Sequence, residues 1–201
     1  MVNAEEEDDL LTEDELILKA RSGDEAAFKE LVETHQDRIF NTAIGFLHNR
    51  EDAEDIAQEV FMAVHQSIGG FHGTSKLSTW LYRITVTKSL DFLRRKKRKK
   101  RFAVILRLGD LQDDKPGYEP ADFIHPGITF ENQERAAVLF KAIDRLPDHQ
   151  KTAFTLCHVE GLSYQETSEV MRVSISSVES LLFRARQNLR EYLRAYYTHE
   201  R

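Results

Sequence analysis

The sequence is poor in residues that break helices or cross-link chains. Its 201 residues include 4 Pro, 9 Gly and a single cysteine, Cys157, which therefore has no partner for an intramolecular disulfide. Runs of β-branched residues are scarce, so helical periodicity dominates. No apolar stretch approaches the ~20 residues needed to cross a bilayer, and the acidic N-terminus lacks the basic start of a signal peptide. These absences predict a helical protein in a reducing cytoplasm.

The sequence also lacks a recognisable catalytic or metal-binding pattern. Its 8 His are scattered, and none lies at a spacing typical of a metal site or of a nucleophile-base pair. An enzyme acting on nucleic acid is therefore disfavoured. We expect no cofactor, no metal and no small-molecule substrate.

Charge of each sign is concentrated in one block. Residues 1–15 hold eight acids and no Lys or Arg, so the formal net charge of -6 leaves +2 on the rest of the chain. Residues 94–101 are eight consecutive cations. Local clusters set the field that a phosphate backbone meets, so the acidic total does not exclude nucleic acid. Residues 1–12 are interpreted as a disordered, solubilising tail; the alternative is a decoy for the basic block that weakens non-specific DNA binding.

Helix breakers divide the remaining chain into two helical segments. Residues 13–103 contain periodic apolar stretches, the last of which continues into the basic block. Residues 104–128 are rich in Pro and Gly, and residues 129–198 are helical again. A structureless stretch of that length separates domains rather than interrupting one. The predicted fold is all-α, with two small helical domains joined by a flexible linker.

The segment Leu162–Asn188 has the pattern of a helix-turn-helix. Ser163 and Glu166 match a capping box for a short helix, and Ser174 is placed to cap the next one. That longer helix has an apolar face at helical spacing, made of Val178, Leu182, Ala185 and Leu189. Its polar first turns suit the major groove of DNA. A plain helical hairpin has the same pattern, so this alternative stays open on geometry alone.

These residues resemble a known family. Leu162–Glu166, Ser174–Val178 and Phe183–Arg190 resemble region 4 of bacterial sigma factors. Upstream, Asp52–Phe61 resembles region 2.2, and Leu77–Ile84, followed by Asp91 and Arg94-Arg95, resembles regions 2.3 and 2.4. The order of the regions and the linker length resemble the extracytoplasmic-function (ECF) group of the sigma-70 family. The resemblance covers nearly all of the chain after the acidic tail.

The resemblance implies a role for each domain. Region 2, residues 13–103, is expected to bind the clamp of the RNA polymerase β′ subunit and to open the -10 element of a promoter. Region 4, residues 129–198, is expected to bind the -35 element and the β flap, with the linker threading toward the active-site cleft. The chain itself would catalyse nothing. An anti-sigma factor is a candidate partner, because members of this group are commonly held inactive by one.

The helix that begins near Arg50 carries the expected polymerase site. Glu51, Asp55, Gln58 and Met62 lie roughly on one face, away from the apolar stripe. An acidic stripe with one apolar contact suits a basic partner helix, whereas the alternative is a solvated acidic face. With the resemblance, the expected polymerase contacts are Asp52, Asp55, Gln58, Glu59 and Met62.

The loop that follows, Phe71–Lys76, offers an aromatic ring, hydroxyls and flexible backbone, which suit an unstacked base. The resemblance implies that this loop captures a flipped base of the -10 strand. For Phe71 the alternative is a core anchor, and for Trp80 burial is as well supported as stacking on DNA. A membrane surface is disfavoured for the cations because no large apolar face accompanies them. The expected -10 contacts are Phe71, His72, Thr74, Ser75, Trp80, Thr87, Lys88, Arg94 and Arg95.

Region 4 supplies the expected -35 contacts, which are Arg172, Ser174, Ser176, Ser177, Ser180, Arg184 and Arg186. Arg172 stands where Gly is frequent, which predicts a turn without positive φ. Glu179 and Leu181 stand where Lys and Arg are frequent, which predicts weaker phosphate anchoring and a larger share for Arg184 and Arg186. In region 2, Thr87 stands where Asn is often found, so the -10 preference is expected to differ.

Two further functions remain open at this point. A helix-turn-helix regulator that binds DNA without polymerase explains the C-terminal half, but it leaves the acidic helix and the Phe71 loop unassigned. A pure interaction module is the other alternative, and promoter-specific transcription in a reconstituted system would exclude it.

Overall fold

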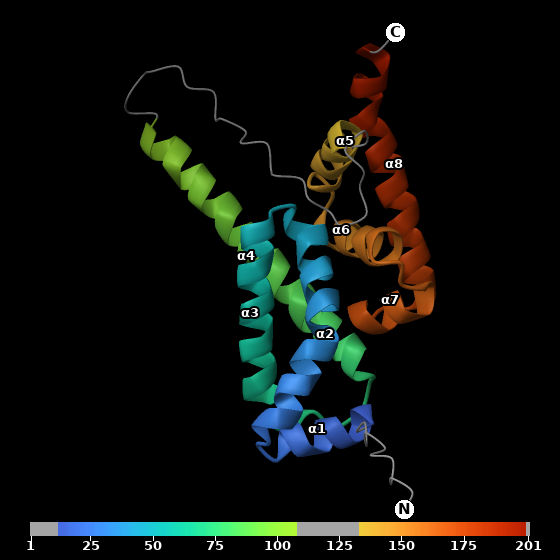
Figure 1. Ribbon diagram of the computed structural model, residues 1–201. Helices are drawn as coiled ribbons and strands as arrows, with labels where there is room; N and C mark the ends of the chain where they lie inside the picture. The colour runs from blue at the N-terminus through green and yellow to red at the C-terminus, as the bar shows by residue number, and fades with distance from the viewer. Residues whose placement is uncertain (1–11, 108–132, 200–201) are drawn as a thin grey trace, which may run out of the picture.

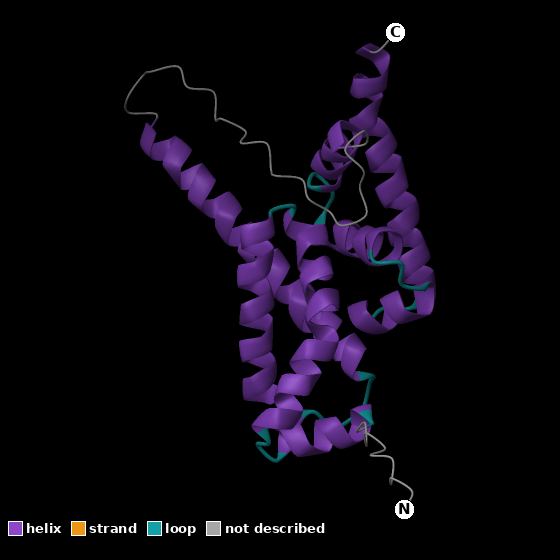
Figure 2. Ribbon diagram, in the orientation of Figure 1, coloured by secondary structure: helices purple, strands orange, loops and turns teal. Residues whose placement is uncertain are grey.

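The computed structural model describes residues 12–107 and 133–199, and every regular element within these ranges is helical (Figures 1 and 2). The first range contains α1 (Glu13–Arg21), α2 (Glu25–Leu47), α3 (Arg50–Ser67), the 3₁₀ turn η1 (Ile68–Gly70) and α4 (Leu77–Arg107). The second contains α5 (Gln133–Ile143), α6 (Asp148–Phe154), the π-helical turn η3 (Thr155–Val159), α7 (Tyr164–Met171) and α8 (Ile175–His199). None of the described helices is long and apolar enough to span a membrane. The all-α prediction is confirmed.

Short polar side chains mark where the helices of the first range begin. The Asp24 carboxylate accepts the N–H of Ala26 at 2.9 Å, and the Asn49 side chain accepts the N–H of Asp52 at 2.8 Å. Each cap satisfies a backbone donor that the start of a helix leaves unpaired, and contributes about 1 kcal/mol. α2 ends at His48, which adopts the left-handed conformation with φ 54° and lets the chain reverse directly into α3.

The N-terminal domain packs α2, α3 and α4 against one another, with α1 across their ends (Figure 1). The predicted apolar stripe of α3 is buried at Ala53, Ile56, Val60 and Val64. It packs with buried residues of the neighbouring helices, which include Leu31, Ile39, Phe46, Leu77 and Leu81. Each large apolar side chain that leaves water here contributes roughly 1.5–3 kcal/mol, so this stripe fixes the orientation of α3 and its polar face.

The C-terminal domain packs α5, α6 and α7 onto the long helix α8. The predicted apolar face of α8 is buried in two clusters. One contains Ala185 and Leu189 with Phe140, Ile143 and Leu146, and the other contains Val178 and Leu182 with Ala153. The face of α8 opposite these clusters is therefore left to solvent.

Helix boundaries differ from the prediction at two places. α4 continues to Arg107, so residues 104–107, assigned to the linker, extend the helix; they contain no Pro or Gly that would end it. Within residues 129–198, which were predicted to be helical, the chain widens into the π turn η3 after Phe154. The rest of the predicted linker, residues 108–128, and the tail as far as residue 11 lie outside the described residues.

The two domains are not separate units, because they share an apolar interface. Leu156 of η3 and Val170 of α7 are buried in the core of the N-terminal domain. Helix α4 contacts α7, and α2 contacts η3. Two helical domains were predicted, but their packing against each other was not. Both sides of the interface also carry polar groups, which are described below.

Candidate nucleic-acid and protein interfaces

Helices α7 and α8 form the predicted helix-turn-helix. The Ser163 hydroxyl accepts the N–H of Glu166 at 3.2 Å, and the Glu166 carboxylate accepts the N–H of Ser163 at 2.9 Å. This is the predicted capping box, and its hydrogen bonds hold the pKa of Glu166 below its ordinary value. Ser174 caps α8 by accepting the N–H of Ser177 at 3.2 Å. The first turns of α8 are thus fixed by the residues that the sequence indicated.

The turn between α7 and α8 contradicts the prediction for Arg172. This residue is the C-cap of α7 and has φ 55° and ψ 45°, which is the left-handed conformation expected for Gly. Its backbone N–H is bonded to the carbonyl oxygens of Ser168 and Glu169, so the end of α7 imposes the conformation whichever side chain is present. A non-Gly residue costs about 1 kcal/mol there.

The outward face of α8 presents the predicted polar residues. Ser176, Ser180 and Arg184 are exposed, and Glu179 lies beside them. The Ser174 hydroxyl is within 3.0 Å of Ser176 Oγ and within 2.8 Å of Ser177 Oγ, so the hydroxyls are linked to one another. Arg186 points elsewhere, toward His158 at 3.3 Å and Tyr164 at 3.4 Å. The arrangement leaves Arg184 as the cation best placed on the face of Ser176 and Ser180.

The polar face of α3 divides into a free part and a paired part. Asp55, Gln58 and Met62 are exposed, and the Met62 side chain is 58% accessible. Asp52 and Glu59 are instead paired with cations of α4. Lys96 lies 2.7 Å from Asp52, and Glu59 lies 3.3 Å from Lys88 and 4.0 Å from Arg95. Of the five predicted polymerase contacts, three are therefore free and two hold α4 in place.

The loop before α4 is only partly available to a ligand. Phe71 is 7% exposed, and its ring packs 5.0 Å from the ring of half-buried Trp80. The interpretation of Phe71 as an open stacking surface is therefore wrong, and the alternative, a core anchor, is correct. Phe71 follows η1 directly and packs at the end of the helical core. Burial of its apolar ring there is more favourable than exposure of the ring to water. His72 and Thr74 are exposed, whereas Ser75 is half-buried and accepts a long hydrogen bond from Arg83 at 3.5 Å.

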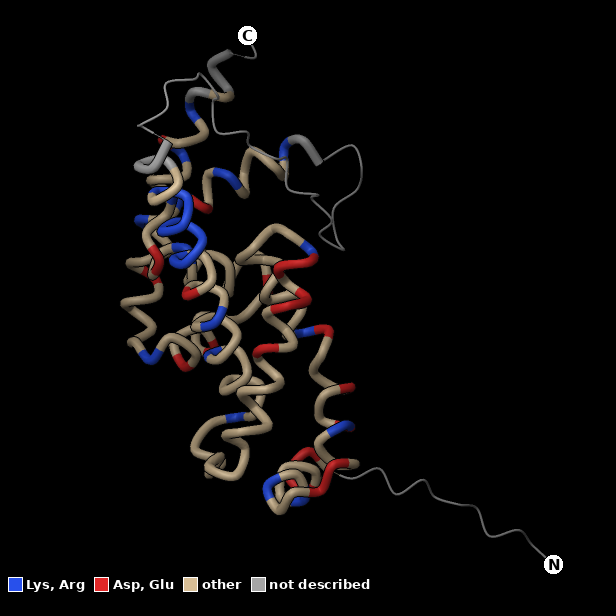
Figure 3. Tube along the Cα trace, turned by 90° about the vertical axis from the view of Figure 1, so that its left-hand side faces the viewer, with Lys and Arg blue, Asp and Glu red and all other residues tan. Residues whose placement is uncertain are grey.

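Helix α4 carries the remaining predicted cations. Thr87 is exposed and donates to the carbonyl of Arg83 at 2.8 Å, so its hydroxyl is bonded within the helix. Arg94 is bonded to Asp91 at 3.2 Å and reaches Asp148 of the other domain at 2.8 Å. The carboxylate of Asp148 raises the pKa of Arg94. In Figure 3 the lysines and arginines of the basic run form one continuous block on this helix.

Both domains match families of known proteins. Residues 31–99 match the family model of sigma-70 region 2, and residues 136–189 match that of sigma-70 region 4. The RNA polymerase sigma-H factor of Pseudomonas aeruginosa is 32% identical over 86% of this chain and 89% of its own length. The chain belongs to the ECF group of the sigma-70 family. It is a sigma factor, a subunit that directs RNA polymerase to promoters.

Other relatives of this sigma factor agree. The ECF sigma-E factor of Haemophilus influenzae is 33% identical over 88% of this chain and 93% of its own length. The ECF factor SigE of Mycolicibacterium smegmatis is 36% identical over 86% of the chain, which spans 65% of that relative. Among solved structures, CnrH in complex with the cytosolic domain of CnrY has a TM-score of 0.60, at 22% identity over 90% of this chain and 96% of that one. RpoE of Bartonella quintana in complex with the anti-sigma factor NepR has a TM-score of 0.56, at 22% identity over 83% and 96%.

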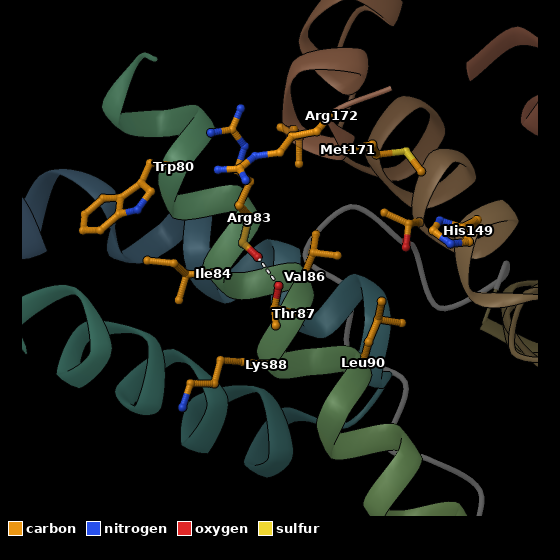
Figure 4. A pocket seen from close by; sticks show the side chains of 12 residues that line it. Trp80, Arg83, Ile84, Val86, Thr87, Lys88, Leu90, His149, Met171 and Arg172 are labelled. Atoms are coloured by element: carbon orange, nitrogen blue, oxygen red, sulfur yellow. Dashed lines mark hydrogen bonds between the residues drawn. The ribbon is translucent and has the colours of Figure 1, made fainter. Parts of the chain in front are cut away.

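Between the two domains of the sigma factor lies a groove of about 500 Å³ (Figure 4). Its walls come from α4 on one side and from α6 and α7 on the other, and they include Trp80, Ile84, Thr87, Val170 and Met171. Three expected -10 contacts, Trp80, Thr87 and Lys88, therefore line this groove, opposite residues of region 4. In this closed arrangement region 4 forms the opposite wall of the groove.

A buried lysine joins the domains. Lys151 of α6 is 3% exposed, and its ammonium donates to the carbonyl of Phe46 at 3.0 Å and to Asp144 at 2.6 Å. Burial lowers the pKa of Lys151, and the carboxylate of Asp144 opposes that shift. Burial acts to raise the pKa of Asp144, but the hydrogen bond from His48 and the charge of Lys151 hold it below its ordinary value. Lys151 thus binds one of the carbonyls that the C-terminus of α2 leaves free.

A half-buried carboxyl lies on the same interface. Burial raises the pKa of Glu160 to about 7, and Glu160 Oε2 lies 3.0 Å from the Thr42 hydroxyl of α2. The same hydroxyl donates to the carbonyl of Arg38 at 2.8 Å. A hydroxyl has one proton and cannot donate to both. Protonated Glu160 resolves the conflict by donating to Thr42, so the geometry favours a neutral carboxyl in the closed arrangement.

None of these interdomain residues was identified from the sequence. Lys151 and Glu160 look like ordinary surface charges, because Lys151 lies between Gln150 and Thr152 and Glu160 precedes the helix-ending Gly161. Their partners are more than a hundred positions away along the chain, and no local spacing records such contacts. The one available signal was the Leu146-Pro147 start of α6, which placed Lys151 in the first turns of a helix.

Proposed function

We propose that this sigma factor binds the β′ clamp of core RNA polymerase through the exposed face of α3. Asp55, Gln58 and Met62 supply a carboxylate, an amide and an apolar contact on one side of the helix, which suits a basic partner helix. Asp52 and Glu59 act less directly in this proposal, because their pairing with Lys96 and Lys88 orients the basic half of α4. The observation that carries the proposal is this free acidic face, on the same domain as the cations of α4.

We further propose that region 2, residues 13–103 with its helical extension to 107, opens and reads the -10 element. The candidate contacts are the exposed loop residues His72 and Thr74 with Ser75, the groove residues Trp80, Thr87 and Lys88, and the cations Arg94 and Arg95. Phe71 supports this loop from the core. Region 4, residues 129–198, binds the -35 element through α8 and also contacts the β flap. The protein has no reaction of its own in this proposal, and it acts in the cytoplasm, where its polymerase works.

The closed arrangement must open for both elements to be read at once. The element names place the two sites about 25 base pairs apart, which at 3.4 Å per pair is about 85 Å. Helix α4 contacts α7, and α7 contacts α8, so the two reading helices lie far closer than that. The 25 residues between α4 and α5 can span at most about 85 Å when fully extended. Chain length therefore permits the separation that promoter binding requires.

An anti-sigma factor is proposed as a regulator. In one solved structure with the same fold RpoE is in complex with the anti-sigma factor NepR, and in another CnrH is in complex with the cytosolic domain of CnrY. A partner that stabilised the closed arrangement would restrict access to the -10 surface of α4. Co-purification from cells grown without an inducing signal tests for such a partner.

Run-off transcription with core polymerase on genomic fragments tests the proposed function. We expect discrete transcripts with the wild-type chain and a strong loss with Asp55→Lys plus Gln58→Ala. The matched control is Glu33→Lys, which reverses an exposed acid on α2 that is not among the expected contacts. DNA binding without any transcript would support the regulator that works without polymerase. Equal loss with the control would contradict the assignment of the α3 face.

A further inference from the structure

Two arginines from different domains lie side by side at the interdomain groove. Arg83 comes from α4 of region 2, and Arg172 is the left-handed corner of the helix-turn-helix in region 4; both line the groove (Figure 4). The charge of Arg172 helps burial to lower the pKa of Arg83, so the two cations are close enough to repel each other. Arg172 is exposed, so solvent screens part of this repulsion, and the two guanidinium groups together form a positive patch that attracts an anion.

The protein groups around the pair do not supply enough negative charge. Arg83 donates to the carbonyl of Glu169 at 2.7 Å and to Ser75 at 3.5 Å, but its buried Nε has no hydrogen-bond partner. No hydrogen bond or ion pair is formed by the Arg172 side chain within residues 12–107 and 133–199. Glu169 is the one acid whose charge acts on Arg83, and its carboxylate is bonded to Gln165. Lys88 also lines the groove, and its charge is paired with Glu59.

We propose that the acidic N-terminal segment of this chain, Glu5–Asp9, docks at the Arg83–Arg172 pair and holds the two domains closed. The segment has five consecutive carboxylates, and the pair offers two guanidinium groups, which bind carboxylates with paired hydrogen bonds. Because the pair is assembled from both domains, an anion bound there favours the closed arrangement over the open one. The proposal goes beyond the promoter-binding function and does not depend on it.

The length of the chain supports this occupant. The start of α1 lies close to the start of α4. Glu13 of α1 lies 3.3 Å from His35 of α2, and His35 lines a small cavity together with Leu77, the first residue of α4. Arg83 is six residues along α4 from Leu77, about 9 Å away. The five acids lie three to seven residues before Thr12, so an extended chain carries them about 10–25 Å from it. They can therefore reach the arginine pair.

The reach of the tail also disfavours the alternative in which the tail acts as a decoy for the basic block. The block of residues 94–101 begins about 26 Å along α4 from Leu77 and ends about 36 Å away. That is farther than the extended tail delivers its acids from Thr12. Figure 3 also shows the basic block well separated from α1, where the tail is attached. The tail is therefore predicted to act on the interdomain pair.

A single reporter tests the proposal in the full-length chain. Trp80 is the only tryptophan and lines the groove, so it gives one indole N–H signal in the NMR spectrum. A nitroxide is attached at Ala4→Cys in a Cys157→Ala background. We expect the label to broaden the Trp80 signal beyond what a freely moving tail would cause. Salt near 1 M, which shortens the screening length to about 3 Å, is expected to restore the signal.

Two variants remove one side of the contact each. Arg172→Gly removes the cation and suits the φ of 55°, so this variant is expected to fold. Replacing Glu5, Glu6 and Glu7 by Gln and Asp8 and Asp9 by Asn removes the anions without changing side-chain size. Both are expected to restore the Trp80 signal, whereas Arg190→Ala, an exposed cation elsewhere on α8, is expected to leave it broadened. An unbroadened wild-type signal, equal broadening in Arg172→Gly, or equal release by Arg190→Ala would overturn the proposal.

Discussion

Glu160 shows how one buried group couples the closed arrangement to pH. Its pKa is about 7, raised by burial from an ordinary value of 4.5. The closed state therefore holds a proton that the open state releases. The stabilisation is fully present below pH 4.5 and is lost as pH rises through about 7. Its upper limit is about 3 kcal/mol at ~1.4 kcal/mol per pKa unit, and partial exposure of the side chain makes it smaller.

We expect the closed fraction to fall between about pH 5 and 8 in the wild-type chain, and this fall to be lost in Glu160→Gln. The amide mimics the protonated carboxyl and can donate to Thr42 at every pH. Energy transfer between dyes at Ser67→Cys and Arg190→Cys, in a Cys157→Ala background, measures the change. Glu33→Gln is the control. Persistence of the same pH step in Glu160→Gln would assign it to another group.

The left-handed backbone conformation of Arg172 is expected to have a measurable effect on the free energy of unfolding. Arg172→Gly is expected to raise the free energy of unfolding by about 1 kcal/mol, because Gly adopts the left-handed conformation without strain. Arg172→Ala keeps the strain and loses the cation, so it separates the two effects. Urea unfolding of the three proteins provides the measurement. A Gly variant no more stable than the Ala variant would show that the corner is not strained.

At the scale of elements, α8 carries the expected -35 contacts. Arg184→Ala is expected to weaken binding to a -35 duplex and to reduce the salt dependence by about one phosphate contact, because Arg184 is the exposed cation on the face of Ser176 and Ser180. Titration of the duplex at several salt concentrations measures both quantities. Arg135→Ala, on the exposed side of α5, is the control. Unchanged affinity in Arg184→Ala would refute the assignment of this face.

Structural features that depend on residues nearby in the sequence could be predicted from it. The apolar stripe of α3 and the face of α8 follow helical spacing, and Ser163 and Ser174 cap their helices as expected. The conformation of Arg172 was not predictable from its side chain, because the end of α7 imposes it. Phe71 offered both interpretations, and only its packing with Trp80 decides between them.

Long-range contacts could not be predicted from the sequence, for a different reason. The Lys151 ammonium meets the carbonyl of Phe46, and Glu160 meets Thr42, across an interface between domains that local patterns treat as independent. A salt bridge or a buried carboxyl of this kind depends on where two surfaces meet, not on residue spacing. The same holds for the pairing of Asp52 and Glu59 with cations of α4, which the sequence did not indicate.

At the scale of the whole molecule, the domain interface decides what the sigma factor can read. Region 4 faces Trp80 and Thr87 of α4 across the groove in the closed arrangement, and we expect both promoter elements to be reached only after the domains separate. The interface is stabilised by apolar burial at Leu156 and Val170, by the buried Lys151 and by the Arg94–Asp148 pair. We expect opening to be coupled to polymerase and promoter binding.

A disulfide across the interface tests this account most directly. A Cβ on Gly45 of α2 would lie 3.3 Å from Cγ2 of Thr155, whose hydroxyl is buried without a hydrogen-bond partner. Gly45→Cys with Thr155→Cys, in a Cys157→Ala background, therefore suits a cross-link between the domains. Run-off transcription with core polymerase is measured on one preparation before and after reduction. The account predicts no transcript when the chain is oxidised and recovery on reduction; equal transcription in both states would contradict it.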